Sequence, residues 1–224
     1  MTVQSAVLRQ IPLFAALSEN QLARIAGMTV ERHYERGDII LLEGDQGGAL
    51  CFVSGGLVKV FKTSPEGREQ VLRLIAAGYT FNDVPALDGG PNPASAAAME
   101  ASTVYMIRHA ELRQLIMTEP EVATAVIKTL AQALRHLVGL VEDLSLRHVT
   151  ARVAKLLLEQ ETSSTIKATG HQLTQQEMAA IVGTAREVVG RALKELETAG
   201  AIEMRQGRAT ILNRERLQVL SGIG

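Results

Sequence analysis

The sequence has little cysteine, few aromatic residues and almost no net charge. Its 224 residues include one cysteine, Cys51, and no tryptophan, and aromatic residues make up 3% of the chain. A single cysteine excludes an intramolecular disulfide and a four-thiolate iron–sulfur cluster, and it fits a reducing compartment. No stretch approaches the roughly 18 uninterrupted apolar residues of a membrane helix, and the N-terminus lacks the pattern of a signal peptide. We therefore expect a cytoplasmic protein with no membrane segment.

What the chain does contain is enough apolar sequence to fold and an uneven distribution of charge. Apolar residues make up 46% of the sequence, which excludes an intrinsically disordered chain. The net charge of −1 divides into −4 over residues 1–146 and +3 over residues 147–224. A basic second half favours a polyanionic partner for that part, although a difference of this size is a weak indication when taken alone.

Short β-rich segments alternate with glycine-containing turns between residues 30 and 108. Many short strands at regular spacing predict a rolled antiparallel sheet. Residues 82–98 are rich in Gly, Pro and Ala and are predicted to form a loop with room for one short helix. Before the sheet, residues 5–28 are predicted as one or two short helices, with Ser18 and Gln21 at capping-box spacing. The predicted strands cover Ile39–Leu42, Ala49–Val53, Leu57–Lys62, Gln70–Ile75 and Thr103–Ile107.

A long helix is predicted from Pro120 to Leu146, where apolar residues recur with the period of a coiled coil. Two apolar stripes let one helix pack both on its own domain and on a partner chain, so a homodimer is favoured over burial of one wide face in a single core. The second stripe consists of Ile127, Leu134, Val138 and Val141. The predicted dimer seam consists of Val126, Leu130, Ala133, Leu137, Leu140 and Leu144.

The strongest local pattern lies between Leu173 and Ile202. A first helix is predicted from about Thr174 to Val182, and Gly183 provides a tight turn before a second helix. The first helix begins with the capping-box pair Thr174–Glu177, and the pair Thr184–Glu187 repeats this spacing at the second. Two helices joined by a short turn that contains glycine are the signature of a helix-turn-helix. Residues 150–161 are predicted as a further amphipathic helix before this unit.

One face of the second helix is apolar and the other is charged. Arginine can donate two hydrogen bonds to guanine and glutamate can accept one from cytosine, so the charged face predicts base reading in the major groove. A basic β-hairpin follows and is predicted to close the chain, with strands Ala201–Arg205 and Ala209–Leu212 joined at Gln206-Gly207-Arg208. The alternative is that this charged face has no ligand and is the solvent-exposed face of an ordinary helical hairpin. The predicted DNA contacts are Thr174, Arg186, Glu187, Gly190, Arg191, Lys194 and Arg208, with Lys194 and Arg208 as phosphate contacts.

The order of these parts resembles the CRP/FNR family of bacterial transcription regulators. The resemblance rests on ERGDIILLEGD at 35–45, FVSGGLVKVF at 52–61, SPEGREQVLRLIAAG at 64–78 and EDLSLRHVTARVAKLLLE at 142–159, followed by the helix-turn-helix. It implies an α+β fold with a cyclic-nucleotide-binding-like β-roll sensor domain at residues 1–118, a dimerisation helix at 119–146 and a winged helix-turn-helix DNA-binding domain at 147–224.

The resemblance also implies the function. A homodimer of this family is expected to bind double-stranded DNA at a palindromic operator and to work with RNA polymerase, in the role of an activator. Arg186, Glu187 and Arg191 resemble the CRP-like reading motif, which implies half-sites similar to TGTGA. The chain lacks the N-terminal cysteine cluster of the FNR branch, so an iron–sulfur oxygen sensor is not expected.

The sensor part departs from the cyclic-nucleotide pattern of this family. Nucleotide-binding members carry a Gly-Glu pair and an Arg-Ser or Arg-Thr pair, and no arginine lies between Arg73 and Arg108 in this sequence. A cyclic phosphate needs charge-assisted donors, so binding of cyclic AMP or cyclic GMP is not expected. The aliphatic walls of the remaining pocket suit an apolar effector or haem. The predicted effector pocket consists of Asn82, Asp83, Ser95, Ala96, Leu134, Leu137, Val138 and Val141.

Haem is a candidate cofactor, with Cys51, His109 and His136 as iron ligands by residue type. No spacing singles out any of them. Cys51 fits a packed core thiol, His109 fits a surface or capping residue, and His136 lies in the middle of the long helix. No catalytic set or metal-ligand spacing stands out, so an enzyme is not expected. The alternative function is a dimeric β-roll module for protein interaction or regulation that does not bind DNA.

Overall fold

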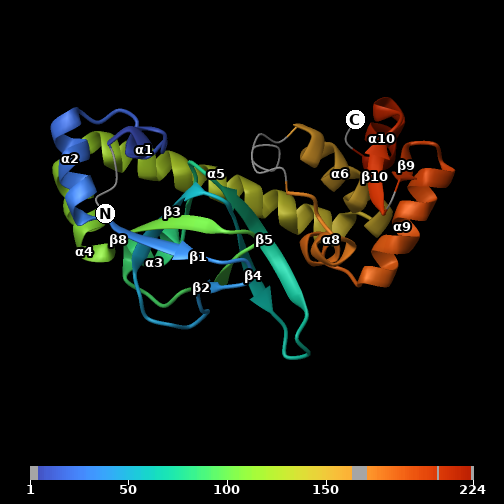
Figure 1. Cartoon of the computed structure of the whole chain (residues 1–224), viewed down its shortest axis with the longest axis horizontal. Coiled ribbons are helices and arrows are strands. Elements are labelled where there is room, and N and C mark those ends of the chain that lie inside the picture. The colour runs from blue at the N-terminus through green and yellow to red at the C-terminus, as the bar shows by residue number, and fades with distance from the viewer. Residues whose placement is uncertain (1–4, 163–170, 206, 223–224) are drawn as a thin grey trace. The chain divides into compact units, whose positions relative to one another are not determined.

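The structure is a computed structural model that describes residues 5–162, 171–205 and 207–222. Its contacts divide the chain into two compact units, which we describe separately (Figure 1). The first unit comprises Met1–Lys62 and Arg73–His136, and the second comprises Thr63–Leu72 and Leu137–Gly224. The long helix α5 (Pro120–Leu146) contributes to both units and has the predicted bounds. Among the described residues, no helix is long and apolar enough to cross a membrane.

The first unit contains most of two four-stranded sheets, with strand orders β1-β8-β3-β6 and β2-β7-β4-β5, while the end of β4 and the first half of β5 fall in the second unit. The eight strands are β1 (Val30–Tyr34), β2 (Ile39–Leu41), β3 (Ala49–Gly55), β4 (Leu57–Thr63), β5 (Glu69–Ala76), β6 (Thr80–Phe81), β7 (Ser95–Ala98) and β8 (Ser102–Arg108). Its helices besides α5 are α1 (Ser5–Arg9), α2 (Glu19–Met28), α3 (Asp83–Asp88) and α4 (His109–Thr118). The predicted rolled antiparallel sheet is confirmed.

Strand β3 separates two apolar cores because its successive side chains point to opposite faces. Leu50 and Phe52 face a core shared with the helices, where Phe52 stacks on Tyr105 with ring centroids 5.2 Å apart. Cys51 and Val53 face the other core, inside the roll. The strand is therefore buried on both sides, which explains its nearly continuous apolar sequence.

The structure corrects the prediction for residues 82–98. This segment contains the short helix α3, but residues 95–98 form strand β7 rather than a loop. Strand β7 pairs with both β2 and β4, and all four of its small side chains are buried. Because small residues buried on both faces leave no alternation of polar and apolar positions, the strand has no sequence signature.

The second unit contains the predicted helix-turn-helix. Its elements besides the end of α5 are α6 (Val149–Thr162), α8 (Gln175–Val182), α9 (Arg186–Thr198), β9 (Ile202–Arg205), β10 (Arg208–Ile211) and α10 (Arg214–Ser221). Helix α6 packs against α9 and α10. The hairpin strands differ by one residue from the predicted bounds, and the predicted turn residue Gln206 lies outside the described residues.

Two features of the second unit differ from the prediction. The hairpin does not close the chain, because α10 follows it, with Asn213 as N-cap and Leu217 buried. The predicted capping pair Thr184–Glu187 is wrong, because helix α9 has Ala185 as its N-cap and no side-chain cap. Thr184 still belongs to the turn, where its N–H donates to the carbonyl of Ala179. The predicted capping boxes at Ser18 and Thr174 are confirmed.

Candidate functional site

The two helices of the helix-turn-helix are joined by a tight turn at Gly183. Gly183 ends α8 in the left-handed region, with φ of 71°. A Cβ atom at Gly183 would lie 2.6 Å from both Leu144 Cδ2 and Gln70 Oε1. Other residues rarely adopt this conformation, and a Cβ atom here would force the ends of the Leu144 and Gln70 side chains to move. The turn between the two helices is therefore packed directly on the last turn of α5, within the second unit.

Helix α9 divides into a buried face and a charged face. The buried face consists of Val189, Ala192, Leu193 and Leu196. On the opposite face, Arg186, Glu187, Arg191 and Lys194 are exposed and Gly190 is half-buried. Within the described residues, these four charged side chains form no ion pair or hydrogen bond with another side chain. The structure thus brings together the predicted base-reading residues on one face whose charges are free to bind an external partner.

Two further residues on this surface were not predicted. A Cβ atom at Gly190 would lie 3.6 Å from Oε1 of Gln175, so the first residue of α8 reaches the charged face of α9. In the hairpin, Arg208 lies directly opposite Arg205, and both are exposed. Like charges at directly opposite positions destabilise a hairpin unless something neutralises them. Arg205 is partly neutralised by Glu203, 2.8 Å away.

Thr174, also a predicted DNA contact, is exposed at the start of α8. Its hydroxyl accepts a hydrogen bond from the N–H of Glu177 at 3.2 Å, and its own N–H donates to Oε2 of Glu177 at 2.7 Å. The first capping box therefore orients this helix end without using the hydroxyl proton of Thr174, which stays available for a phosphate oxygen.

In the first unit, the predicted effector residues Asn82 and Ser95 are engaged within the protein. Asn82 has φ of 62° and is, among the described residues, the non-glycine residue with positive φ. Its carboxamide donates to the carbonyl of Ala49 at 3.0 Å and to Oδ1 of Asn92 at 3.1 Å. Asn92 is 3% exposed and donates to the carbonyl of Leu42. The hydroxyl of Ser95 accepts from the N–H of Glu43, and Ala96 lies in the core inside the roll.

A small pocket lies beside α3 and the first half of α5. Its volume is about 10 Å³, which is room for roughly one water-sized sphere. Of the predicted effector residues it includes Asp83, while Leu134, Val138 and Val141 on α5 are 62–63% exposed and do not line it. The lining consists of Leu13, Leu50, Asp83, Leu87, Leu112, Val126, Thr129 and Leu130. Several of these leucines are far apart in the sequence, so no local pattern could have identified the pocket.

Asp83 is the charged group of this apolar pocket. Burial raises the pKa of its carboxyl group, against the opposing effects of a hydrogen bond from Thr80 and the nearby cation of Arg73. The Thr80 hydroxyl lies 2.9 Å from Oδ1, and Nη1 of Arg73 lies 3.8 Å from Oδ2. The side chain is 13% exposed. A buried carboxyl group with a shifted pKa in a pocket marks a candidate functional position.

None of the three residues considered as iron ligands lines this pocket. Cys51 is fully buried in the core inside the roll, and burial raises the pKa of its thiol. Nδ1 of His109 lies 2.8 Å from the carbonyl of Ala86, a contact that holds α4 to α3. His136 is exposed on α5. Among the described residues, no group of three or more potential metal ligands is found.

Six exposed apolar residues of α5 follow a heptad that draws on both predicted stripes, while Val138 and Leu146 are exposed but lie outside it. Ile127, Leu134 and Val141 are 63–68% exposed, while Val126, Ala133 and Leu140 of the predicted seam are half-buried. The spacing of 3 and 4 residues is that of a coiled-coil seam. We call the six residues of this heptad the α5 seam. It consists of Ile127, Leu130, Leu134, Leu137, Val141 and Leu144.

Together, the β-roll, the long helix and the winged helix-turn-helix define a two-part DNA-binding regulator. Residues 31–119 match the model of the cyclic nucleotide-binding domain, and residues 151–220 match that of the Crp-like helix-turn-helix domain. The CRP-like cAMP-activated global transcriptional regulator of Mycobacterium tuberculosis is 30% identical over 94% of this chain and 96% of its own length. The cyclic AMP receptor protein of Thermus thermophilus is 31% identical over 89% of this chain and 92% of its own.

A solved structure shows the same fold. The transcriptional regulator of the Crp/Fnr family from Eubacterium rectale has a TM-score of 0.76 at 24% identity, covering 96% of this chain and 99% of that chain. The chain belongs to the CRP/FNR family of DNA-binding transcription regulators, which are not enzymes. The family assignment made from the sequence is confirmed.

Proposed function

We propose that this protein is a homodimeric transcription regulator that reads a palindromic operator with α9 and responds to a small apolar effector instead of a cyclic nucleotide. The observation that carries the proposal is the charged face of α9, whose side chains are exposed and unpaired within the described residues. RNA polymerase is the partner through which such a regulator acts on transcription.

The dimer is supported by the α5 seam. Six apolar side chains at heptad spacing are 36–68% exposed in the single chain. An exposed apolar stripe of this length is unfavourable in water, and a second copy of the same helix covers it by knobs-into-holes packing. Because the two copies are related by a two-fold axis, the operator has the same symmetry.

We assign recognition of the operator bases to three residues of α9. Arg186 and Arg191 each donate two hydrogen bonds to a guanine, and Glu187 accepts one from a cytosine, which gives half-sites similar to TGTGA. The half-site centres lie about one helical turn apart, roughly 34 Å. Lys194 and Arg208, both exposed, contact phosphates and add affinity without sequence preference.

The effector proposal rests on what the pocket region contains. The two relatives described above are named for cyclic AMP, but the segment from Leu74 to Ile107 has neither arginine nor lysine to pair with a cyclic phosphate. At the start of α3 the Asn82 carboxamide already bonds to Ala49 and Asn92. These two observations support an effector other than a cyclic nucleotide, and the Arg73 cation near the pocket is already paired with Asp83. A pocket of about 10 Å³ admits a small apolar group, and a haem does not enter it without rearrangement.

The proposal is tested by fluorescence anisotropy with a labelled duplex of two TGTGA-like half-sites and a scrambled duplex of equal length. We expect tighter binding to the palindrome, and a steep fall of affinity with salt for both duplexes because phosphate contacts release counterions. A protein that binds neither duplex with salt dependence, with or without candidate effectors, is the interaction module and not the regulator.

Calorimetry with millimolar cyclic AMP and cyclic GMP tests the effector part separately. We expect no saturable heat. Saturable binding at micromolar concentration, accompanied by tighter DNA binding, would contradict the non-nucleotide part of the proposal and leave the DNA-binding part standing.

A further inference from the structure

The second unit holds both the recognition helix and half of the α5 seam. Leu137, Val141 and Leu144 of the seam belong to this unit, as does the whole of α9. The position of α9 relative to these three seam residues is therefore determined by contacts inside one compact unit.

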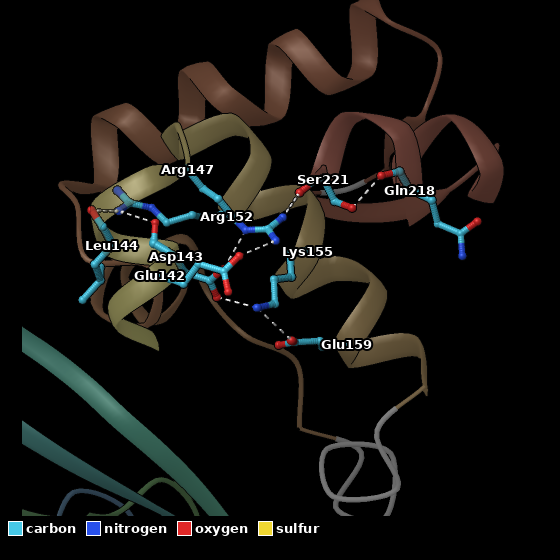
Figure 2. A network of polar contacts seen from close by, with 9 residues as sticks. All are labelled: Glu142, Asp143, Leu144, Arg147, Arg152, Lys155, Glu159, Gln218 and Ser221. Atoms are coloured by element: carbon cyan, nitrogen blue, oxygen red, sulfur yellow. Dashed lines mark hydrogen bonds and ion pairs between the residues drawn. The ribbon is translucent and has the colours of Figure 1, made fainter. Parts of the chain in front are cut away.

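Asp143, on the last turns of α5, is held between two cations (Figure 2). Its Oδ1 lies 2.9 Å from Nε of Arg147, and its Oδ2 lies 2.5 Å from Nζ of Lys155 on α6. The three side chains are only 16%, 19% and 22% exposed, in the order Asp143, Arg147, Lys155. Ion pairs with this little exposure are screened less by salt than surface pairs. We call these two ion pairs the Asp143 clamp.

The clamp reaches α10 through Arg147. The Nη1 atom of Arg147 donates to the carbonyl of Ser221 at 2.5 Å, at the C-terminal end of α10, and Nη2 lies 3.2 Å from Oε1 of Glu142. A cation at a helix C-terminus satisfies a free carbonyl and is favoured by the helix dipole. Arg152 of α6 donates in the same way to the last carbonyls of α5, those of Asp143 and Leu144.

Two more contacts continue from these helices to the reading head. The hydroxyl of Thr150 on α6 donates to Oε2 of Glu195 on α9 at 2.6 Å. Leu144 of the seam lies against the turn at Gly183, where an added Cβ atom would be 2.6 Å from its Cδ2. A hydrogen bond thus joins α9 to α6, and the Asp143 clamp joins α6 to α5. The turn before α9 packs directly on Leu144 of the seam.

We propose that the Asp143 clamp determines the spacing of the operator half-sites that the dimer accepts. Asp143 and Lys155 are positioning residues, since they touch no base but hold α9 at a fixed place relative to the seam. A dimer with two rigidly held recognition helices discriminates against altered spacing, because one inserted base pair both separates and rotates the half-sites. This inference rests on the proposed dimeric DNA-binding function.

Lys155→Met is the variant of choice, because it removes the charge and keeps most of the aliphatic stem. Lys155→Arg restores the charge and is the rescue variant. Glu159→Gln is the matched control, since Glu159 lies 3.9 Å from the same Lys155 Nζ but is 56% exposed, where an ion pair contributes little. Asp143→Asn removes both arms of the clamp.

The first measurement is the affinity for palindromes whose half-site spacing is the preferred one, or differs from it by one or two base pairs. We expect wild type, Lys155→Arg and Glu159→Gln to lose about tenfold in affinity per base pair of change, the order expected when DNA must be deformed to fit. In Lys155→Met and Asp143→Asn the loss falls to about threefold or less, and the preference for one half-site sequence is unchanged.

The second measurement does not use DNA. A spin label on Val219→Cys, a position on α10 that is 79% exposed, gives one distance between the two subunits, because the native Cys51 is fully buried. We expect a narrow distance distribution in wild type and Lys155→Arg and a broader one in Lys155→Met.

The outcomes separate this inference from the function on which it rests. If wild type prefers one spacing and Lys155→Met shows the same preference and the same distance distribution, the clamp is not the spacing determinant. If wild type binds no palindrome, the proposed function fails, and an unchanged distribution in Lys155→Met then also overturns the clamp. If the spin-labelled protein gives no inter-subunit distance, it is not a dimer, and this result contradicts both the inference and the proposed function.

Discussion

Helices α9 and α3 each begin at the edge of a candidate site, and they use polar side chains in opposite ways. On α9, Arg186 and Arg191 are exposed and unpaired within the described residues. At the start of α3, the carboxamide of Asn82 instead bonds to Ala49 and Asn92 of the same domain. Polar groups serve an external ligand only where the protein itself leaves them unsatisfied, because a satisfied group must lose its bonds before it binds.

The backbone at the start of α3 shows the same contrast. The positive φ of Asn82 shows that the backbone at the start of α3 has a conformation that glycine adopts most readily and asparagine tolerates. The asparagine also supplies a side chain that bonds to Ala49 and Asn92. We expect substitutions on α9 to change DNA binding without changing stability, and substitutions around α3 to do the reverse.

The largest effect is expected from a substitution that prevents dimer formation, because operator binding by α9 depends on the dimer. Leu137→Glu places a charge in the α5 seam against its symmetry mate, which costs several kcal/mol of dimer stability. Sedimentation should show a monomer, and binding to the palindrome should be lost. Met117→Glu is the control, since Met117 is 79% exposed outside the seam. A Leu137→Glu protein that remains dimeric with normal affinity would show that the seam is wrongly assigned.

Arg186→Ala tests whether an unpaired side chain of α9 binds a base. We expect a loss of about 1–3 kcal/mol in binding to the preferred operator, because one bidentate contact to guanine disappears. The thermal melting temperature should not change, since the side chain is exposed. Arg113→Ala, an exposed arginine on α4, is the control for loss of charge. A similar loss of affinity in both variants would mean that Arg186 contributes only charge.

Asn92→Ala tests whether the hydrogen bonds at the start of α3 stabilise the fold. The buried carboxamide accepts from Asn82 and donates to the carbonyl of Leu42, and its removal breaks both of these hydrogen bonds in the interior of the domain. We expect a loss of about 1–3 kcal/mol in the free energy of unfolding, measured by urea denaturation. Asn20→Ala, at an exposed position on α2, should change stability little. An Asn92→Ala protein as stable as wild type would show that the network is not structural.

The smallest expected effect depends on pH. The pKa of Asp83 is raised in the folded protein by burial, so the folded state binds this proton more tightly than the unfolded state. The stability that this proton contributes is complete below about pH 4 and is lost as the pH rises through the raised pKa. Asp83→Asn should therefore melt at a higher temperature than wild type near neutral pH. The difference should vanish in acid, and a difference that is constant with pH would exclude ionisation of Asp83 as its cause.

The helices and strands that could be predicted from the sequence have apolar residues at regular spacing. Those that were missed lack such a spacing. The bounds of α5 and the two helices of the reading head follow from apolar residues at helical spacing. Strand β7 has only small buried residues, and α10 buries Leu217 as its one large apolar side chain, so neither has a clear pattern.

The candidate sites show the same division. The charged face of α9 could be predicted because one helix carries all its residues, and helical geometry alone brings them together. The pocket could not be predicted, because Leu13, Leu50 and Leu112 meet only after the roll and its covering helices have packed. The Asp143 clamp also depends on tertiary contacts, since Lys155 and the end of α10 reach Asp143 and its neighbour Arg147 from other helices.

The central claim is that α9 reads bases of a symmetric operator, and selection of binding sites from random DNA tests it most directly. The selection is run in parallel on wild type and Arg186→Ala, with and without candidate effectors, because a ligand-free dimer can hold its recognition helices out of register with the grooves. The account predicts that wild type selects a palindrome of TGTGA-like half-sites and that Arg186→Ala loses preference at one position of each half-site. Selection of the same motif with the same sharpness by both proteins, or of no palindrome by wild type under any condition, would contradict it.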